Sequence, residues 1–187
     1  RTHLAIFSPD RLEYAAVTYD NYGLAIRTLP NQNTVATGEI GVWIDGGTYS
    51  PSGDYLAMMA SGGDLYIWET ETWRLIYEDE TIATSFDTVA FVPDADTLVV
   101  GNGEEVQIFE IANSAVSRPE TWQVKDDMVS DSFLLSINSI AFSPDGKYMA
   151  IGNFFDGAYL FDFEERTQVL ELTCDCTPKS MDFNGDG

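Results

Sequence analysis

Short runs of apolar residues, separated by turn residues, divide the chain from end to end. In the clearest unit, residues 137–173, an apolar run ends at Phe142 and the turn Ser143-Pro144-Asp145-Gly146 follows. Further apolar runs cover 148–152, 159–163 and 167–172, and Asp156-Gly157 separates the first two of these. Proline fixes φ, glycine accepts positive φ, and Asp-Gly is typical of two-residue hairpins. We predict four short antiparallel strands in this unit, and no helix longer than a turn anywhere in the chain.

The same unit recurs along the chain. "IFSPD", "TYSPSGD", "AFVPDAD" and "AFSPDGK" are copies of one motif, and "MDFNGDG" aligns as the start of a fifth copy. The aromatic residue of the motif lies at Phe7, Tyr49, Phe91, Phe142 and Phe183, with spacings of 42, 42, 51 and 41 residues. Four short strands repeated about every 42 residues are typical of a β-propeller blade. The predicted units are 1–42, 43–84, 85–135 and 136–177, and 178–187 begins the fifth.

These motifs resemble those of the WD-repeat family, whose blades carry an FSPDG-like turn, a Gly/Asp hairpin and a Trp-Asp pair that closes the third strand. The closing pair is here Trp68-Glu69, Phe109-Glu110 and Phe161-Asp162, and in the first unit it is Arg27-Thr28. The Gly-His pair of the family is absent, since the chain has one histidine, His3. The chain is therefore similar to divergent, prokaryotic-type WD-repeat propellers over nearly all of its length. The resemblance implies an all-β fold of four-stranded antiparallel blades.

The number of units raises the question of how the propeller closes. Four units and the first strand of a fifth are present, whereas propellers of this family usually close with about seven blades, and closed propellers in general use four to eight. Because proteins normally avoid unpaired sheet edges, we expect a segment of a longer propeller that contacts further blades or flanking domains. The alternative is closure as four blades, with residues 178–187 completing the first blade.

The final residues also resemble the opening of a calcium loop, since Asp182, Asn184 and Asp186 alternate before Gly187. In the repeat register they are instead a strand and its turn, and the other copies lack this spacing of oxygen ligands. A complete loop would need a bidentate carboxylate further along the chain. We favour the turn and predict neither metal nor cofactor. A calcium site is the alternative.

Residues suited to catalysis are sparse. A single histidine leaves no convincing Ser-His-Asp or Cys-His set in this chain. Cys174 and Cys176 are too close for an ordinary disulfide and too few for a closed zinc site. We interpret them as small residues at a strand end, with a redox or metal pair as the alternative. The prediction is that this chain is not an enzyme.

Charge narrows the choice of partners. With 31 acidic and 9 basic residues the net charge is −22. Such a surface repels phosphate backbones and anionic lipids, so nucleic acid and acidic membranes are poor partners. No apolar run reaches 18 residues, so no membrane span is predicted, and no signal peptide is visible. The acidity serves either solubility or the docking of a basic protein, and it fits a high-salt or an extracytoplasmic location.

One rim of the predicted propeller is the expected binding face. The hairpins between second and third strands share this rim with the connections between blades. The candidate contact residues on it are Asp64, Glu104, Glu105, Phe154, Phe155 and Asp156. We interpret Phe154 and Phe155 as aromatic anchors at a hairpin tip, with packing under a neighbouring blade as the alternative. The extra residues of the third unit, between Ala112 and Ser136, are typical of a binding loop or of sequence drift.

The predicted function is a non-enzymatic scaffold that presents an acidic propeller rim to a protein partner. The first alternative is a sensor or accessory propeller within a larger signalling or catalytic protein. A propeller enzyme or a sugar-binding lectin is a third hypothesis, and it requires polar residues that converge on a central pocket.

Overall fold

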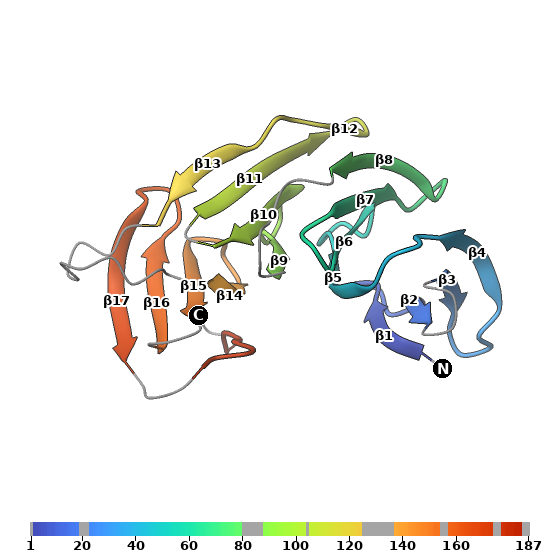
Figure 1. Ribbon diagram of the computed structural model, residues 1–187, viewed down its shortest axis with the longest axis horizontal. Helices are drawn as coiled ribbons and strands as arrows, with labels where there is room; N and C mark the ends of the chain where they lie inside the picture. The colour runs from blue at the N-terminus through green and yellow to red at the C-terminus, as the bar shows by residue number, and fades with distance from the viewer. Residues whose placement is uncertain are drawn as a thin grey trace.

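The fold is all-β. The computed structural model describes residues 2–18, 23–79, 88–103, 105–124, 137–153, 157–173 and 177–184. All regular secondary structure in these ranges is β-strand. The strands form four antiparallel sheets that stand side by side along an open arc (Figure 1). Within the same ranges no helix is long and apolar enough to cross a membrane. The prediction of an all-β propeller fold is confirmed.

Each sheet is one blade, and its strands pair in chain order except in blade 3, where β12 and β13 both pair with β11. Blade 1 contains β1 (Thr2–Phe7), β2 (Glu13–Thr18), β3 (Gly23–Thr28) and β4 (Thr34–Glu39). Blade 2 contains β5 (Ile44–Tyr49), β6 (Tyr55–Ala60), β7 (Leu65–Glu69) and β8 (Arg74–Asp79). Blade 3 contains β9 (Thr88–Phe91), β10 (Thr97–Asn102), β11 (Glu105–Ala112), β12 (Ala115–Val116) and β13 (Glu120–Gln123). Blade 4 contains β14 (Ile137–Phe142), β15 (Tyr148–Asn153), β16 (Gly157–Asp162) and β17 (Thr167–Thr173).

The third blade accommodates part of its extra length as strand. Asn113 and Ser114 both take positive φ (51° and 59°) and reverse the chain after β11. The returning segment forms β12 and then β13, and both pair with β11. The described part of the insertion therefore adds two outer strands to the sheet rather than a free loop, and residues 125–136 lie outside the described ranges.

A serine hydroxyl organises the recurring turn between the first and second strands. In blade 4 the Oγ atom of Ser143 accepts the N–H of Tyr148 at 2.8 Å and donates to Asp145 Oδ1 at 2.6 Å. Asp145 Oδ1 also accepts the N–H of Lys147 at 3.0 Å. Ser8 in blade 1 and Ser50 in blade 2 accept the N–H of the residue five positions on in the same way. The Ser-Pro-Asp motif is thus explained by side-chain bonds that satisfy the turn's own backbone.

The core lies between blades. Side chains alternate between the two faces of a strand, so blades 2 and 3 each have one face toward the preceding blade and one toward the following blade. Three buried clusters fill the three seams between consecutive blades. The innermost strands β1, β5, β9 and β14 also contact one another in succession. Hydrophobic burial at the seams, rather than a central core, therefore holds the arc together.

Close packing at one seam predicts a glycine requirement. A Cβ on Gly101 of β10 would lie 2.6 Å from Ile137 Cγ2 and 2.6 Å from Thr88 Cγ2, so neighbours would have to move. We expect Gly101→Ala to lower the free energy of unfolding by about 1–3 kcal/mol. Gly38 of β4 has open space around its Cβ position, so Gly38→Ala should change stability far less. Denaturant unfolding of both variants tests this, and equal losses would contradict the packing argument.

Residues 177–184 lie against blade 4. Pro178 O accepts a hydrogen bond of 2.9 Å from Ser139 Oγ, and it lies 3.0 Å from the Cβ position of Gly152. Gly101 occupies the matching place in blade 3, where its Cβ position meets Ile137 of the next unit. Pro178 thus lies where the first strand of a following blade would begin. The segment forms no strand in the described ranges and does not complete blade 1, so closure as four blades is not the arrangement observed.

Candidate functional site

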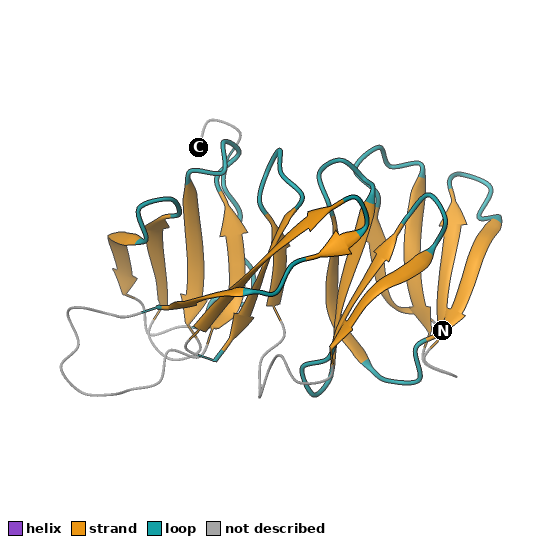
Figure 2. Ribbon diagram, turned by 90° about the horizontal axis from the view of Figure 1, so that it is seen from above, coloured by secondary structure: helices purple, strands orange, loops and turns teal. Residues whose placement is uncertain are grey.

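The blades present two rims. One, the hairpin rim, carries the turns between second and third strands and the connections between blades, and it is the lower edge in Figure 2. The other, the serine-turn rim, carries the turns between first and second strands and those between third and fourth strands. The contact residues predicted from the sequence belong to the hairpin rim.

Two of those candidates lie within the described residues. Asp64 is half-buried before β7, and its carbonyl oxygen accepts the N–H of Ala60 at 2.8 Å. Glu105 is half-buried at the start of β11 and accepts a hydrogen bond from Gln123 Nε2 of β13. They belong to different blades, 2 and 3. The other candidates, Glu104, Phe154, Phe155 and Asp156, lie outside the described residues, so their contact role stays a prediction.

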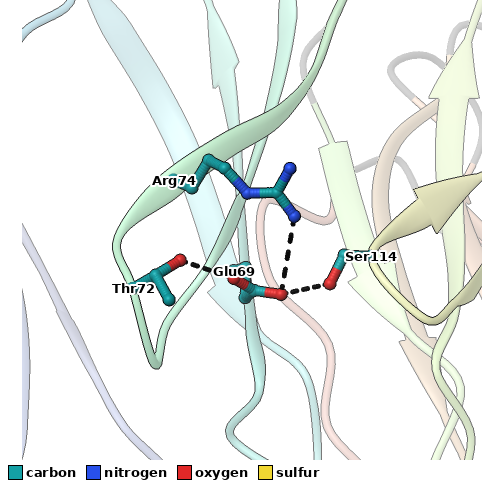
Figure 3. Close-up of polar contacts among 4 residues, drawn as sticks. All are labelled: Glu69, Thr72, Arg74 and Ser114. Carbon is teal, nitrogen blue, oxygen red and sulfur yellow. Dashed lines mark hydrogen bonds and ion pairs between the residues drawn. The ribbon is translucent and has the colours of Figure 1, made fainter.

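The serine-turn rim carries a polar network that sequence analysis did not identify (Figure 3). Glu69, the acid of a closing pair, accepts hydrogen bonds from Thr72 and from Ser114 of blade 3, and Arg74 Nη2 lies 3.8 Å from its Oε1. The bonds from Ser114 and Thr72 lower the pKa of Glu69. Glu69 is therefore ionised at neutral pH and joins blade 2 to blade 3.

Other polar contacts join the blades on the same rim. Ser52 Oγ donates to Asp96 Oδ1 at 3.1 Å between blades 2 and 3. Between blades 3 and 4, Arg166 Nη2 lies 3.7 Å from Glu120 Oε1, and its guanidinium carbon lies 5.0 Å from the ring centre of Trp122. Glu69, Ser52 and Arg166 thus connect neighbouring blades, each at a different seam or turn.

A cavity opens on the serine-turn rim between blades 1 and 2. It measures about 230 Å³. We call it the seam cavity; its lining residues are Ser8, Pro9, Asp10, Glu13, Tyr49, Ser52, Gly53, Asp54, Thr70 and Glu71. Tyr49 is 7% exposed, and its hydroxyl has no hydrogen-bond partner among the described residues. Burial raises the pKa of Tyr49, and the charges of Glu13 and Asp10 raise it further, so the phenol is neutral at neutral pH.

The seam cavity combines four carboxylic acids with a neutral hydroxyl. Within the described residues, no group of three or more His, Cys, Asp or Glu has the arrangement of a metal site. Asp182 is exposed, whereas Asp186 and Gly187 lie outside the described ranges, and the calcium site stays a hypothesis. Aspartates at the matching turn position, Asp10 and Asp145, bind the backbone of their own turns, which agrees with the turn interpretation.

The turn aspartates predict a weak acid dependence of stability. The Ser143 hydroxyl, followed by the Lys147 N–H, lowers the pKa of Asp145 below its ordinary value. A folded-state pKa below the unfolded one stabilises the fold above the unfolded value, and this contribution is lost as the pH falls through the folded value. We expect Asp145→Ala to reduce the drop in melting temperature between about pH 5 and pH 2. An unchanged pH profile would show that the turn bond makes no contribution.

Comparison with known proteins supports the fold. No protein-family profile matches the chain. Minichromosome loss protein 1 of Schizosaccharomyces pombe is 26% identical over 132 residues, which cover 67% of this chain and 15% of that protein. Hydrazine synthase of Kuenenia stuttgartiensis matches with a TM-score of 0.73 and 13% identity, over 91% of this chain and 48% of that one. The dihydro-heme d1 dehydrogenase NirN, in complex with DHE, matches with a TM-score of 0.72 and 17% identity, over 95% and 38%.

The fold class of this protein therefore rests on structural similarity and not on a sequence family. The chain has a β-propeller fold, and it spans less than half the length of each of these relatives. At such identities the structural matches establish the fold alone.

Proposed function

We propose that this chain is a non-enzymatic interaction scaffold of the divergent WD-repeat type, which presents an acidic surface to a basic protein partner. The observation that carries the proposal is the net charge of −22 on an arc of blades that pack against one another. Charge of one sign on a rigid body attracts a partner of the opposite sign and repels nucleic acid. The resemblance of the closing pairs supports the WD-repeat type, since Trp68, Phe109 and Phe161 are all buried at matching positions.

The polar groups of the rims support binding rather than turnover. Asp10 and Asp145 accept hydrogen bonds from their own turns, and Glu69 accepts one from the neighbouring blade. Such residues are held in place by the fold, which suits a preformed binding surface. Both rims supply carboxylates that a basic protein could contact.

A second candidate function is that of an accessory propeller in a larger signalling or catalytic protein. The lengths of the matched proteins favour this accessory function, because the chain spans only 15%, 48% and 38% of them. The two candidates are separated by the sequence of the parent protein. Flanking catalytic or signalling domains would favour the accessory function.

Affinity capture followed by direct binding tests the proposed function. The immobilised chain is incubated with extract at low salt, retained proteins are eluted with salt, and purified candidates are titrated against the chain by calorimetry. We expect at least one basic protein to bind with a defined stoichiometry, and an acidic protein of similar size, as control, not to bind. If every purified candidate fails to bind, or binds equally well when it is acidic, the proposal is wrong.

A further inference from the structure

The seam between blades 1 and 2 departs from the repeat at two facing positions. The motif aromatic is Phe7, Phe91 or Phe142 in the other blades but Tyr49 in blade 2. The residue five positions after the turn's first residue is Tyr55, Thr97 or Tyr148 elsewhere but Glu13 in blade 1. Tyr49 and Glu13 come from different blades and both line the seam cavity. Each departure adds a polar group to the same space.

The remaining wall of the cavity is acidic. Asp10, Asp54 and Glu71 line it together with Glu13, and no lysine or arginine is among its described lining residues. Asp10 is ionised, because the Ser8 hydroxyl and the Leu12 N–H lower its pKa. The cavity therefore concentrates negative charge without an internal counter-charge, and this favours a cationic occupant.

Tyr49 adds an observation that does not depend on the acids. Its side chain is more than nine-tenths buried, the residue lines the cavity, and its buried hydroxyl has no hydrogen-bond partner among the described residues. A buried hydroxyl that lacks a partner lowers stability, and phenylalanine at the same position in the other blades avoids this cost. The neutral hydroxyl is suited to accept a hydrogen bond from a ligand that enters the cavity.

We propose that the seam cavity binds the side chain of an arginine in a basic protein segment, with the guanidinium donating to Glu13 and to the Tyr49 hydroxyl oxygen. At about 230 Å³ the cavity is smaller than the 300–1,000 Å³ typical of sites for whole small-molecule ligands, and its size suits one inserted side chain. Guanidinium carries five donors in a plane and matches several acceptors at once. The inference rests on the proposed function and places a specific anchor for the basic partner on the serine-turn rim.

A short peptide tests the cavity without knowledge of the partner. The probe is acetyl-Gly-Arg-Gly-amide, titrated into isotope-labelled chain at low salt and followed by NMR. We expect shift changes confined to the cavity wall, at Tyr49, Gly53, Asp54 and Thr70. The citrulline peptide, which has the same shape without the charge, should not bind, and the lysine peptide should bind more weakly because it donates from a single point.

Two variants with a matched control locate the site. Glu13→Gln keeps the size of the side chain, and Tyr49→Phe restores the residue of the other repeats; each should weaken the arginine peptide about tenfold. Glu164→Gln removes an exposed acid from the same rim in blade 4 and should leave the affinity unchanged. Tyr49→Phe should also raise the melting temperature while it weakens binding, a combination that a purely structural tyrosine would not produce.

The outcomes separate this inference from the proposed function. Equal binding of the citrulline peptide, or equal weakening by Glu13→Gln and Glu164→Gln, would overturn the cavity as an arginine site. If the arginine peptide fails to bind while a basic protein binds the chain, the cavity inference is wrong and the scaffold stands. If the peptide binds as expected and no basic protein does, the site stands and the proposed scaffold function is wrong.

Discussion

Replacing Phe109 with alanine is expected to lower the free energy of unfolding by about 3–5 kcal/mol. Phe109 lies in β11, is 0% exposed, and belongs to the cluster between blades 2 and 3. Its ring centre lies 5.6 Å from that of Tyr77 in an edge-on arrangement across the seam. Truncation would leave a cavity between the sheets of blades 2 and 3. The hydrogen-bonded strands on either side restrict movement into this cavity, so much of it would stay unfilled. Denaturant unfolding at equilibrium measures the change.

Phe7→Ala provides the control for this prediction. Phe7 is the motif aromatic of blade 1, and it is 56% exposed. Its truncation should cost well under half as much as that of Phe109, because little area returns to water. If Phe7→Ala is as destabilising as Phe109→Ala, packing at the seams is not the main source of stability.

Salt should slow the binding of a basic partner by a large factor. Opposite net charges steer association and raise its rate constant about 10- to 1,000-fold at low ionic strength. Raising salt from about 50 to 500 mM shortens the Debye length and should remove most of this gain. Surface plasmon resonance with the partner identified by capture measures both rate constants. We expect the association rate to fall at least tenfold, while the dissociation rate changes much less.

The dissociation rate provides the contrasting measurement. Contacts made in the bound state, including any aromatic anchor at Phe154 or Phe155, act mainly on dissociation. An association rate that is independent of salt would show that the acidity serves solubility alone. The proposed acidic scaffold would then be wrong, and the fold would be unaffected.

The strands were predictable because their signals are local. The serine that opens the turn accepts a backbone N–H of the same turn, so Ser-Pro at this position is followed by the same serine bond in blades 1, 2 and 4. In blade 3 Val92 replaces the serine, yet β9 and β10 still pair, because the apolar pattern sets the register. The positions of the outer strands β12 and β13 in blade 3 were not predicted, since they depend on the reversal at Asn113-Ser114 rather than on a repeated motif.

The seam cavity was less predictable than the strands, because it forms only where a face of blade 1 packs against a face of blade 2. Net charge shows that acids are in excess but not where they gather, and the hairpin rim was selected from the general geometry of blades. The seam cavity lies on the opposite rim and combines residues 36 positions apart in the chain, Glu13 and Tyr49. A signal was present in the aligned repeats, where a tyrosine replaces phenylalanine and a glutamate replaces tyrosine or threonine. Its meaning required the packing of blade 1 on blade 2.

The proposed function requires that carboxylates of this propeller contact a basic protein directly. Zero-length carbodiimide crosslinking of the complex, followed by mass spectrometry, tests it most directly, because it joins carboxylates only to amines in direct contact. We predict crosslinks from acidic residues of the rims, with Glu13, Asp54 and Glu71 among them, to lysines of the partner, and we expect high salt to abolish them. Crosslinks that are absent in a stable complex, or that persist unchanged at high salt, would contradict the claim.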